Sequence, residues 1–518
     1  MPAYAGMHGV LMPDRRRYSF YKGLFPGDVL NFSKRSHYVR EIMLERVYPT
    51  RVILPMKMHY GVPAVPCVRI GDSVLAGQCV GIPEKGTFSV PVHTGISGTV
   101  TDIKPITLPN GIATRAVIIH NDMKRTRLDS LKPRSLMKLS ATEAINIITD
   151  AGICGMGGEG IPTGAKLRRA KKEGVNDFLV NCLQSEPYST SDLTAITEYP
   201  DYVVNGAAAC SRTIGAKRCF FLISEQRKEQ REALELSIGR LKDKFKDITF
   251  DIKIFRERFP QGYYRLIAKA LYGKSINAQD TLERTCGAVL FNCSTMLACW
   301  EALSDNIPMM SRIVSITGDA SGIHNMLVPI GTPVSELINS VGDFRTSGGR
   351  IVWGNCLTGI EIKDPENTPV IKLTSAISII RRQVVPRTPC IHCGLCSECC
   401  PMGLSPNTIY EMLNQGLTQK ASEEGARDCI ACGSCSYICP AGISLTDKIA
   451  AFAGEGRVIE VNSLLYNSGH TATEGELIYD ANEISGSSLL EDYDSAKEED
   501  GRDEEGRIVL PFDGGKKV

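Results

Sequence analysis

The sequence predicts a multidomain protein that combines α/β units with units built from β-strands. At 518 residues the chain is too long for a single hydrophobic core. Its first part is rich in Val, Gly and Pro, and near residue 142 the pattern changes to alternating helices and strands. Near the C-terminus, eight cysteines repeat one spacing twice. We therefore expect a β domain, then an α/β domain, then a small cysteine-rich domain.

Composition and charge narrow the possible functions. A hydrophobic content of 43% and a charged content of 23% are ordinary for a globular protein, and a net charge of +1 argues against nucleic-acid binding. The cysteines outside the repeated motif have no framework spacing, which indicates a reducing compartment. The first residues lack the apolar segment of a signal peptide. We expect the apolar residues 286–303 to form a buried helix and not a membrane span.

The N-terminal part is predicted to be a β-sandwich. Residues 68–81 (VRIGDSVLAGQCVG) and 90–103 (VPVHTGISGTVTDI) contain short strands separated by Gly-Asp and Ala-Gly-Gln turns. The two segments resemble the two halves of a lipoyl/biotinyl-type barrel-sandwich. We expect a barrel-sandwich hybrid domain over residues 1–130.

The next part alternates between helix and strand patterns. An amphipathic segment (ATEAINIITDAGI) precedes a glycine-rich loop and a basic helix, and the apolar runs DFLVN and KRCFFLIS are typical of strands. Strands that alternate with helices favour a parallel sheet. We expect an α/β domain of Rossmann-like type over residues 135–305.

The glycine-rich loop spans residues 152–166 (GICGMGGEGIPTGAK). Its glycines allow the backbone to approach a flat or anionic ligand. The helix that follows begins near Thr163, so its N-terminal amides can hold a phosphate, and Lys166 adds a positive charge one turn later. A tight structural turn is the alternative, and the loop alone does not decide between them. The candidate ligand-binding glycines are Gly155, Gly157, Gly158 and Gly160.

A strand-rich unit is expected over residues 310–380, and the cysteine-rich domain over residues 385–445. The cysteine-rich domain contains CIHCGLCSECCP and CIACGSCSYICP, which share the spacing C-x2-C-x2-C-x3-C-P. That spacing is typical of paired [4Fe–4S] clusters, in which the fourth cysteine of each run binds the other cluster. Two zinc sites or disulfides are the alternatives, but zinc sites normally use two pairs of ligands. The first cluster would take Cys390, Cys393, Cys396 and Cys439, and the second would take Cys429, Cys432, Cys435 and Cys400. Residues 446–518 form an acidic extension for which we expect partial disorder.

Several of these segments together resemble known electron-transfer proteins. The glycine loop, LVNCLQSEPY (179–188) and FNCSTML (291–297) resemble the flavin site of the 51-kDa flavoprotein subunit of respiratory complex I. Residues 315–338 resemble the small β-grasp (SLBB) module that follows that flavin domain. The order of barrel-sandwich, flavin fold and two-cluster ferredoxin is similar to that of the C subunit of Rnf/Rsx electron-transport complexes. The resemblance adds Asn181, Glu186, Asn292 and Thr295 to the candidate cofactor-binding residues.

The resemblance implies a peripheral subunit on the cytoplasmic face of a membrane complex. In such a complex, electrons move between reduced ferredoxin and NAD, coupled to the translocation of sodium ions or protons. The implied cofactors are FMN and two [4Fe–4S] clusters, with NAD(H) as substrate. The implied partners are ferredoxin, a ferredoxin-like cluster subunit and polytopic membrane subunits. The sequence singles out no catalytic residue.

The chain departs from the family pattern around the flavin. Glu159 replaces a small residue of the loop, Gln184 replaces an acid in the segment after Asn181, and Tyr263 and Tyr264 stand in place of Gly and Glu. These changes could reshape or block the NADH site. Two alternatives therefore stay open: a soluble paralogue, such as a cobalamin reductase or a reductase-associated electron carrier, and a relay-only cluster subunit that has lost NADH oxidation.

Overall fold

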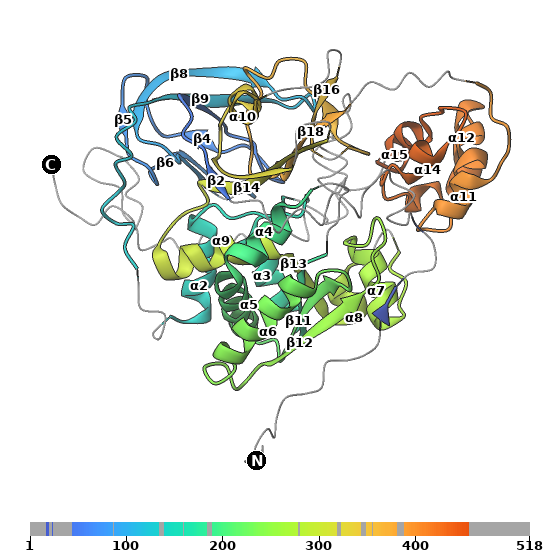
Figure 1. Ribbon diagram of the computed structural model, residues 1–518, viewed down its shortest axis with the longest axis horizontal. Helices are drawn as coiled ribbons and strands as arrows, with labels where there is room; N and C mark the ends of the chain where they lie inside the picture. Colours follow the sequence, from blue (N-terminus) through green and yellow to red (C-terminus); the bar gives the residue numbers. More distant parts are fainter. Residues whose placement is uncertain are drawn as a thin grey trace.

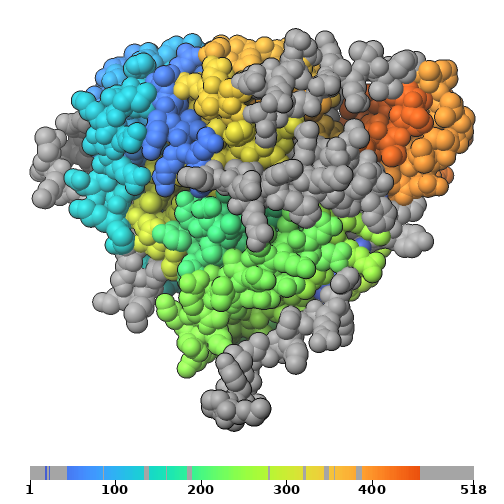
Figure 2. Space-filling view, in the orientation of Figure 1, coloured from blue at the N-terminus to red at the C-terminus, as the bar shows by residue number. Residues whose placement is uncertain are grey.

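Over the residues that it describes, the computed structural model contains four β-sheets and a small helical unit (Figure 1). The barrel lies beside a six-stranded sheet, the α/β domain lies below both, and the helical unit lies to one side. The space-filling view shows these parts packed together without a break between the barrel and the six-stranded sheet (Figure 2). The structure describes residues 17–19, 23, 44–85, 87–133, 139–158, 160–183, 189–277, 280–318, 323–342, 349–354, 356–380 and 388–454.

Two antiparallel sheets form the N-terminal domain, as the sequence predicts. One sheet has the order β3 (Arg51–Pro55), β9 (Ala113–Asn121), β8 (Gly98–Thr107), β5 (Ser73–Val74). The other has the order β4 (Val65–Pro66), β6 (Cys79–Ile82), β7 (Val92–His93). Val52 and Leu54 of β3 are fully buried, and Ile53 between them is buried with Ala116 and Ile118 of β9, so both faces of this strand pair are covered.

A five-stranded parallel sheet is the centre of the α/β domain. Its order is β1 (Arg17–Tyr18), β12 (Thr249–Phe255), β11 (Arg218–Ser224), β10 (Asp177–Asn181), β13 (Ala288–Asn292). Every residue of β10 is buried, as expected for a strand covered by helices on both faces. The helices are α2 (Ala141–Asp150), α3 (Thr163–Lys172), α4 (Ser191–Glu198), α5 (Pro200–Ile214), α6 (Lys228–Leu241), α7 (Tyr264–Tyr272), α8 (Leu282–Cys286), α9 (Cys293–Trp300) and the π-helical η3 (Glu301–Asp305).

The prediction of one buried helix over residues 286–303 is wrong. The segment holds strand β13 followed by helix α9. The side chain of Asn292 accepts a hydrogen bond of 2.8 Å from the backbone N–H of Ser294, which caps α9 and separates the two elements. Periodicity could not reveal this boundary, because a short apolar run fits a central strand as well as a buried helix.

The six-stranded sheet is mixed. Its order is β17 (Ile360–Glu361), β16 (Arg350–Trp353), β18 (Ala376–Ile380), β14 (Ser311–Gly318), β15 (His324–Pro329), β2 (Glu45–Arg46), and helix α10 is Val334–Val341. The central strands β14 and β18 are parallel, whereas β14 pairs with β15 in antiparallel fashion. Strands β1 and β2 come from the N-terminal part of the chain but complete sheets of later domains.

The cysteine-rich unit is helical. It contains α11 (Leu395–Cys399), α12 (Pro406–Asn414), α13 (Thr418–Glu423), η4 (Ala426–Asp428), α14 (Ser434–Ile438) and α15 (Leu445–Gly454). An ion pair of 2.7 Å between Arg265 of α7 and Asp428 joins it to the α/β domain. The acidic extension from residue 455 onward lies outside the described residues. Among the helices that the structure describes, none is long and apolar enough to cross a membrane.

One buried lysine connects three parts of the molecule. Lys372 lies in the loop before β18 and is completely buried. Its Nζ atom donates hydrogen bonds to the carbonyl oxygen of Pro91 in the barrel at 2.8 Å and of Gly152 in the α/β domain at 2.6 Å. Burial lowers the pKa of Lys372 to about 8, although Cys154 and Cys79 nearby act in the opposite direction. The junction between the domains therefore contains a titratable group.

We expect replacement of Lys372 by methionine to change how stability depends on pH. The folded-state pKa lies below the ordinary value of 10.5. Above about pH 8 the unfolded wild-type chain therefore holds more protons than the folded chain, so its free energy of unfolding rises with pH. Relative to Lys372→Met, the wild type should gain about 2 kcal/mol between about pH 8 and pH 10. Anaerobic denaturation of both proteins measures this gap; a gap independent of pH would contradict the expectation. The exposed Lys363, changed to methionine, is the matched control.

Candidate functional site

Two asparagines mark the carboxyl edge of the parallel sheet. Asn181 ends β10 and Asn292 ends β13, and the two residues are direct partners in the register of these adjacent strands. The strands β11 and β12 lie on one side of β10, while β13 lies on the other, so the order reverses between β10 and β13. In open α/β sheets, ligands bind at such a reversal, beyond the carboxyl ends of the strands.

The glycine-rich loop is held over this edge by backbone contacts. The N–H of Gly155 donates to the carbonyl oxygen of Ile161 at 2.8 Å, which closes the loop on itself. The N–H of Met156 donates to the hydroxyl of Thr295 in α9 at 3.0 Å. A Cβ atom added to Gly157 would lie 3.3 Å from the Cβ atom of Asn292. The loop backbone therefore lies against the end of β13, where a side chain would not fit easily.

Three of the sequence-predicted residues form a frame for the loop. Asn292 donates to the carboxylate of Asp192 at 2.7 Å, and that carboxylate also accepts from the hydroxyl of Ser294 at 2.6 Å. Asn181 donates to the carbonyl oxygen of Gly262 at 2.9 Å. Thr295 holds the loop through its hydroxyl. The sequence alone did not single out Asp192, because it lies in α4 within no recognisable motif.

The start of α3 lies next to the same loop. Thr163 is the first residue of the helix and is fully buried, and its hydroxyl has no hydrogen-bond partner among the residues that the structure describes. The Nζ atom of Lys166, one turn later, lies 5.2 Å from the centroid of the Phe291 ring in β13. A positive charge is thus positioned between the helix N-terminus and the carboxyl edge of the sheet.

Of the residues that depart from the family pattern, the structure describes Tyr263 and Tyr264. Glu159, Gln184 and the predicted cofactor residue Glu186 lie outside the described residues. Tyr263 and Tyr264 follow Gly262 directly, and their ring centroids are 4.9 Å apart. Because Gly262 accepts the hydrogen bond from Asn181, both tyrosines lie near the carboxyl edge of β10.

These features fit FMN. Gly158 has a φ of 111°, a conformation that L-residues with side chains rarely adopt, and the preceding Gly157 lies against Asn292. The loop combines an exposed backbone with an adjacent helix N-terminus and a lysine, which suits a flat ring system that carries a phosphate. Lys166, Thr163 and the loop glycines are the residues that would hold it.

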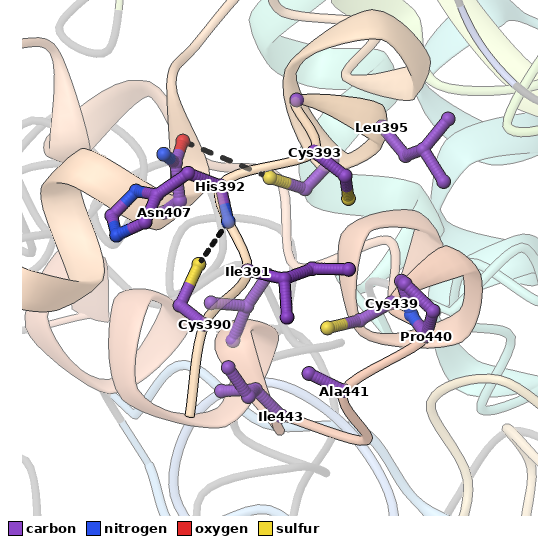
Figure 3. Close-up of a pocket in the computed structure, with 13 residues that line it drawn as sticks. Cys390, Ile391, His392, Cys393, Leu395, Asn407, Cys439, Pro440, Ala441 and Ile443 are labelled. Atoms are coloured by element: carbon purple, nitrogen blue, oxygen red, sulfur yellow. Dashed lines mark hydrogen bonds between the residues drawn. The ribbon is translucent and has the colours of Figure 1, made fainter. Parts of the chain in front are cut away.

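Four of the predicted cluster ligands surround one pocket. The pocket is lined by Cys390, Cys393, Cys396 and Cys439, together with apolar side chains such as Ile443. Three of these cysteines come from the first motif and one from the second, so the motifs cross over as the spacing predicts. In Figure 3 the sulfur atoms of Cys390, Cys393 and Cys439 point toward the same space.

The other four cysteines also lie together. Burial raises the pKa of the Cys435 thiol, and the neighbouring thiols of Cys432, Cys429 and Cys400 raise it further. Burial likewise raises the pKa of Cys432 to about 11, with Cys400 contributing. The raised pKa values mean that four thiolates would be unfavourable here without a positive charge beside them. The iron ions of a cluster would supply that charge in place of the thiol protons.

The two cysteine sets have matching backbone geometry. The N–H of His392 points at the sulfur of Cys390, and the N–H of Ala431 points at the sulfur of Cys429, both at 3.4 Å. His392 and Ala431 share a φ of 53°, and the glycine two residues later has a φ of 79° in both motifs. Thiolate sulfurs that accept backbone N–H groups, each in a loop that turns tightly, fit the donor set of a [4Fe–4S] cluster.

The two sets differ in their surroundings. Cys432 packs with Phe259 of the α/β domain and with Leu357, and a Cβ atom at Gly433 would lie 2.8 Å from the carbonyl oxygen of Leu357. Beside the other set, Ile391 is 63% exposed and Cys393 is exposed. One set therefore faces the rest of the chain and the other faces solvent.

Three family models match the chain in the order of its domains. Residues 18–124 match the RnfC barrel sandwich hybrid domain, residues 148–301 match the Nuo51 FMN-binding domain, and residues 383–440 match the 4Fe-4S dicluster domain. These matches confirm the predicted barrel-sandwich, flavin and cluster domains. They assign FMN and iron–sulfur clusters to the chain as cofactors.

Curated relatives cover most of the chain. The chain is 31% identical over 385 residues to the C subunit of the Na(+)-translocating ferredoxin:NAD(+) oxidoreductase complex of Acetobacterium woodii, covering 73% of this chain and 85% of the relative. It is 29% identical to the C subunit of the proton-translocating ferredoxin:NAD(+) oxidoreductase complex of Clostridium ljungdahlii, covering 78% and 87%. It is 30% identical to the C subunit of the ion-translocating oxidoreductase complex of Serratia proteamaculans, covering 70% of this chain but about half (51%) of that relative.

Among solved structures, the chain resembles an NAD+-reducing [NiFe]-hydrogenase in the H2-reduced state, with a TM-score of 0.45 and 14% identity over 76% of this chain and 72% of that chain. The assignment of the chain to a family is based instead on the curated relatives and on the matching domain order. From these findings, the chain belongs to the family formed by the C subunits of Rnf electron-transport complexes.

Proposed function

We propose that the chain is the peripheral electron-transfer subunit of an Rnf-type ion-translocating ferredoxin:NAD(+) oxidoreductase. In this role it passes electrons between NAD(H) at an FMN site and two [4Fe–4S] clusters. The observation that carries the proposal is the combination, in one chain, of a glycine loop at the reversal of a parallel sheet and two crossed sets of four cysteines. Both parts are needed, because FMN exchanges a hydride with a nicotinamide and single electrons with clusters.

The residues of the chain suit a directed relay. Gly155 and Thr295 hold the loop at the carboxyl edge of the sheet, where Lys166 can pair with a flavin phosphate. The set around Cys432 packs against the α/β domain, and the set around Cys393 faces solvent. We infer that the first of these sets exchanges electrons with the flavin side, and the second with a partner.

The proposal also covers the domain boundaries of the chain, its location and its partners. We infer domain boundaries at 1–130, 135–305, 310–380, 385–445 and 446–518, with an SLBB-type β-grasp module as the third domain. A hairpin, a helix and a return strand parallel to the first strand support that fold. We place the chain at the cytoplasmic face of the membrane, with a ferredoxin-like cluster subunit, polytopic membrane subunits and ferredoxin as partners.

The proposal predicts that NADH reduces the clusters through the flavin site. In the anaerobic holoprotein, NADH should bleach the cluster absorption, as followed by stopped-flow spectroscopy. Lys166→Ala should weaken FMN binding about ten- to a hundredfold, because a charge-assisted contact is lost, and should slow the bleaching at limiting FMN. Lys171→Ala, an exposed lysine farther along α3, is the matched control and should behave as the wild type.

Two outcomes would contradict this proposal. Bleaching that is equally fast in Lys166→Ala would mean that electrons enter the chain elsewhere. An FMN-loaded chain whose clusters respond to dithionite but not to NADH would favour the relay-only alternative, in which Tyr263 and Tyr264 close the nicotinamide side of the site.

A further inference from the structure

Two cysteines outside the cluster motifs meet at one edge of the barrel domain. Cys67 follows β4 and Cys79 begins β6, and these strands are antiparallel neighbours. The N–H of Cys67 donates to the carbonyl oxygen of Val80 at 3.0 Å, which continues the pairing beyond the last residue of β4. Residues separated by a whole strand and a turn are thereby brought side by side.

The side chain of Cys67 reaches across to Cys79 on the neighbouring strand. The Sγ atom of Cys67 donates to the carbonyl oxygen of Cys79 at 3.5 Å, so it lies against the backbone of that residue. The Sγ atom of Cys79 also lies 3.3 Å from the carbonyl oxygen of Gly81. Cys67 is exposed and Cys79 is half-buried. An exposed cysteine thus contacts the backbone of a second, less accessible cysteine.

The pKa values of the two thiols are shifted in opposite directions, which gives Cys67 and Cys79 different roles. The interaction with the Cys79 side chain lowers the pKa of the Cys67 thiol, and the same interaction raises the pKa of the Cys79 thiol. Cys67 is therefore the residue that ionises first. An accessible thiol with a lowered pKa and a second cysteine beside it is the arrangement typical of redox-sensing cysteines.

The other thiols outside the cluster motifs have different surroundings. Cys182 interacts with Cys293, and Cys210 with Cys299, but all four are fully buried. Burial raises the pKa of Cys293 and Cys299, so these pairs are closed to reagents and poor nucleophiles. Outside the cluster motifs, Cys67 is the one exposed cysteine in the part of the chain that the structure describes.

We propose that Cys67 and Cys79 form a redox-sensing dithiol, which low-molecular-weight disulfides oxidise to an intramolecular disulfide in the barrel domain. The Cys67 thiolate attacks one sulfur of the reagent, so its S–S bond breaks, a mixed disulfide forms on Cys67 and one thiolate leaves. The Cys79 thiol then loses its proton and attacks the Cys67 sulfur, which expels the second thiolate. In sum, two protein thiols are oxidised by two electrons and one disulfide is reduced to two thiols.

The strand pairing places the disulfide where it can influence neighbouring segments. Cys79 is the register partner of His93 on β7, and Pro91, two residues earlier, accepts the hydrogen bond from Lys372. The same lysine holds Gly152 at the beginning of the flavin loop. The dithiol nevertheless lies in a different domain from the cluster cysteines, so its oxidation can be followed while the clusters stay intact.

The test treats the anaerobic holoprotein with oxidised glutathione, blocks the remaining thiols with N-ethylmaleimide and digests with trypsin. Cleavage after Lys57, Arg69 and Lys85 places Cys67 and Cys79 in separate peptides, residues 58–69 and 70–85. In the wild type these two peptides should appear joined, and reduction should separate them. Iron content, measured before and after, verifies that the clusters remain in place.

Single variants assign the two roles. In Cys79→Ser, the glutathione adduct should accumulate on Cys67, because no second thiol resolves it. In Cys67→Ser, modification of Cys79 should slow about tenfold or more, because the exposed thiolate is missing. Cys286→Ser, which removes a half-buried thiol elsewhere, should leave the joined peptides unchanged. The proposal fails if the peptides stay separate under conditions that preserve iron, or if Cys79 reacts equally fast without Cys67.

Discussion

Replacing Cys400 by serine should remove the cluster whose other ligands lie in the second motif, and should leave the other cluster in place. Cys400 lies with Cys429, Cys432 and Cys435, not with the cysteines that precede it in the sequence. Serine is a poor ligand for iron in such a cluster. We therefore expect iron to fall from about eight to about four per chain.

Pairs of substitutions test the crossover directly. If Cys400 and Cys429 bind the same cluster, the double variant should lose no more iron than the single one and keep about four per chain. If Cys400 and Cys390 bind different clusters, their double variant should retain almost none. If each motif instead supplied all four ligands of one cluster, the double variant of Cys400 and Cys390 would keep about four iron atoms per chain, and that of Cys400 and Cys429 would retain almost none. Cys399→Ser is the matched control, because Cys399 is buried beside Cys400 without belonging to either set, and it should keep about eight.

The features that the sequence predicts are those that depend on the spacing of residues close together in the chain. The crossed cysteine sets follow from two short motifs, because three cysteines at fixed intervals must turn around a common centre. The glycine loop and the start of α3 at Thr163 were likewise found from adjacent residues. The parallel sheet followed from alternating patterns, and its register then placed Asn181 opposite Asn292.

The parts that were missed depend on contacts between distant segments. Strands β1 and β2 have two residues each, which is too short for any periodicity, and they become strands only because β12 and β15 offer free edges. Asp192 acquires its role by meeting Asn292, a hundred residues later in the chain. Lys372 appears ordinary in the sequence, and only packing places it between two carbonyl groups in other domains.

The flavin loop provides the second large expected effect, in the variant Gly158→Ala. Gly158 has a φ of 111°, where an added Cβ atom is strained whatever the available space. Strain of this kind costs about 1–3 kcal/mol, so the loop should shift away from the edge of the sheet that binds the ring. Since about 1.4 kcal/mol corresponds to a factor of ten in affinity, FMN should bind roughly five- to a hundredfold more weakly.

Gly155→Ala is the control from the same loop, because position and not glycine content should decide the outcome. A Cβ atom at Gly155 would meet only the backbone of Ile161 and Gly160, at 3.7 and 3.8 Å, which is ordinary van der Waals contact. Its FMN affinity should therefore remain close to that of the wild type. Fluorescence titration of FMN into the flavin-free chain measures both variants, and iron content shows whether the cluster domain is intact. Equal losses in the two variants would mean that the loop tolerates no side chain anywhere. Equal retention would mean that FMN does not depend on the backbone at Gly158, and the flavin would then have to bind elsewhere on the sheet.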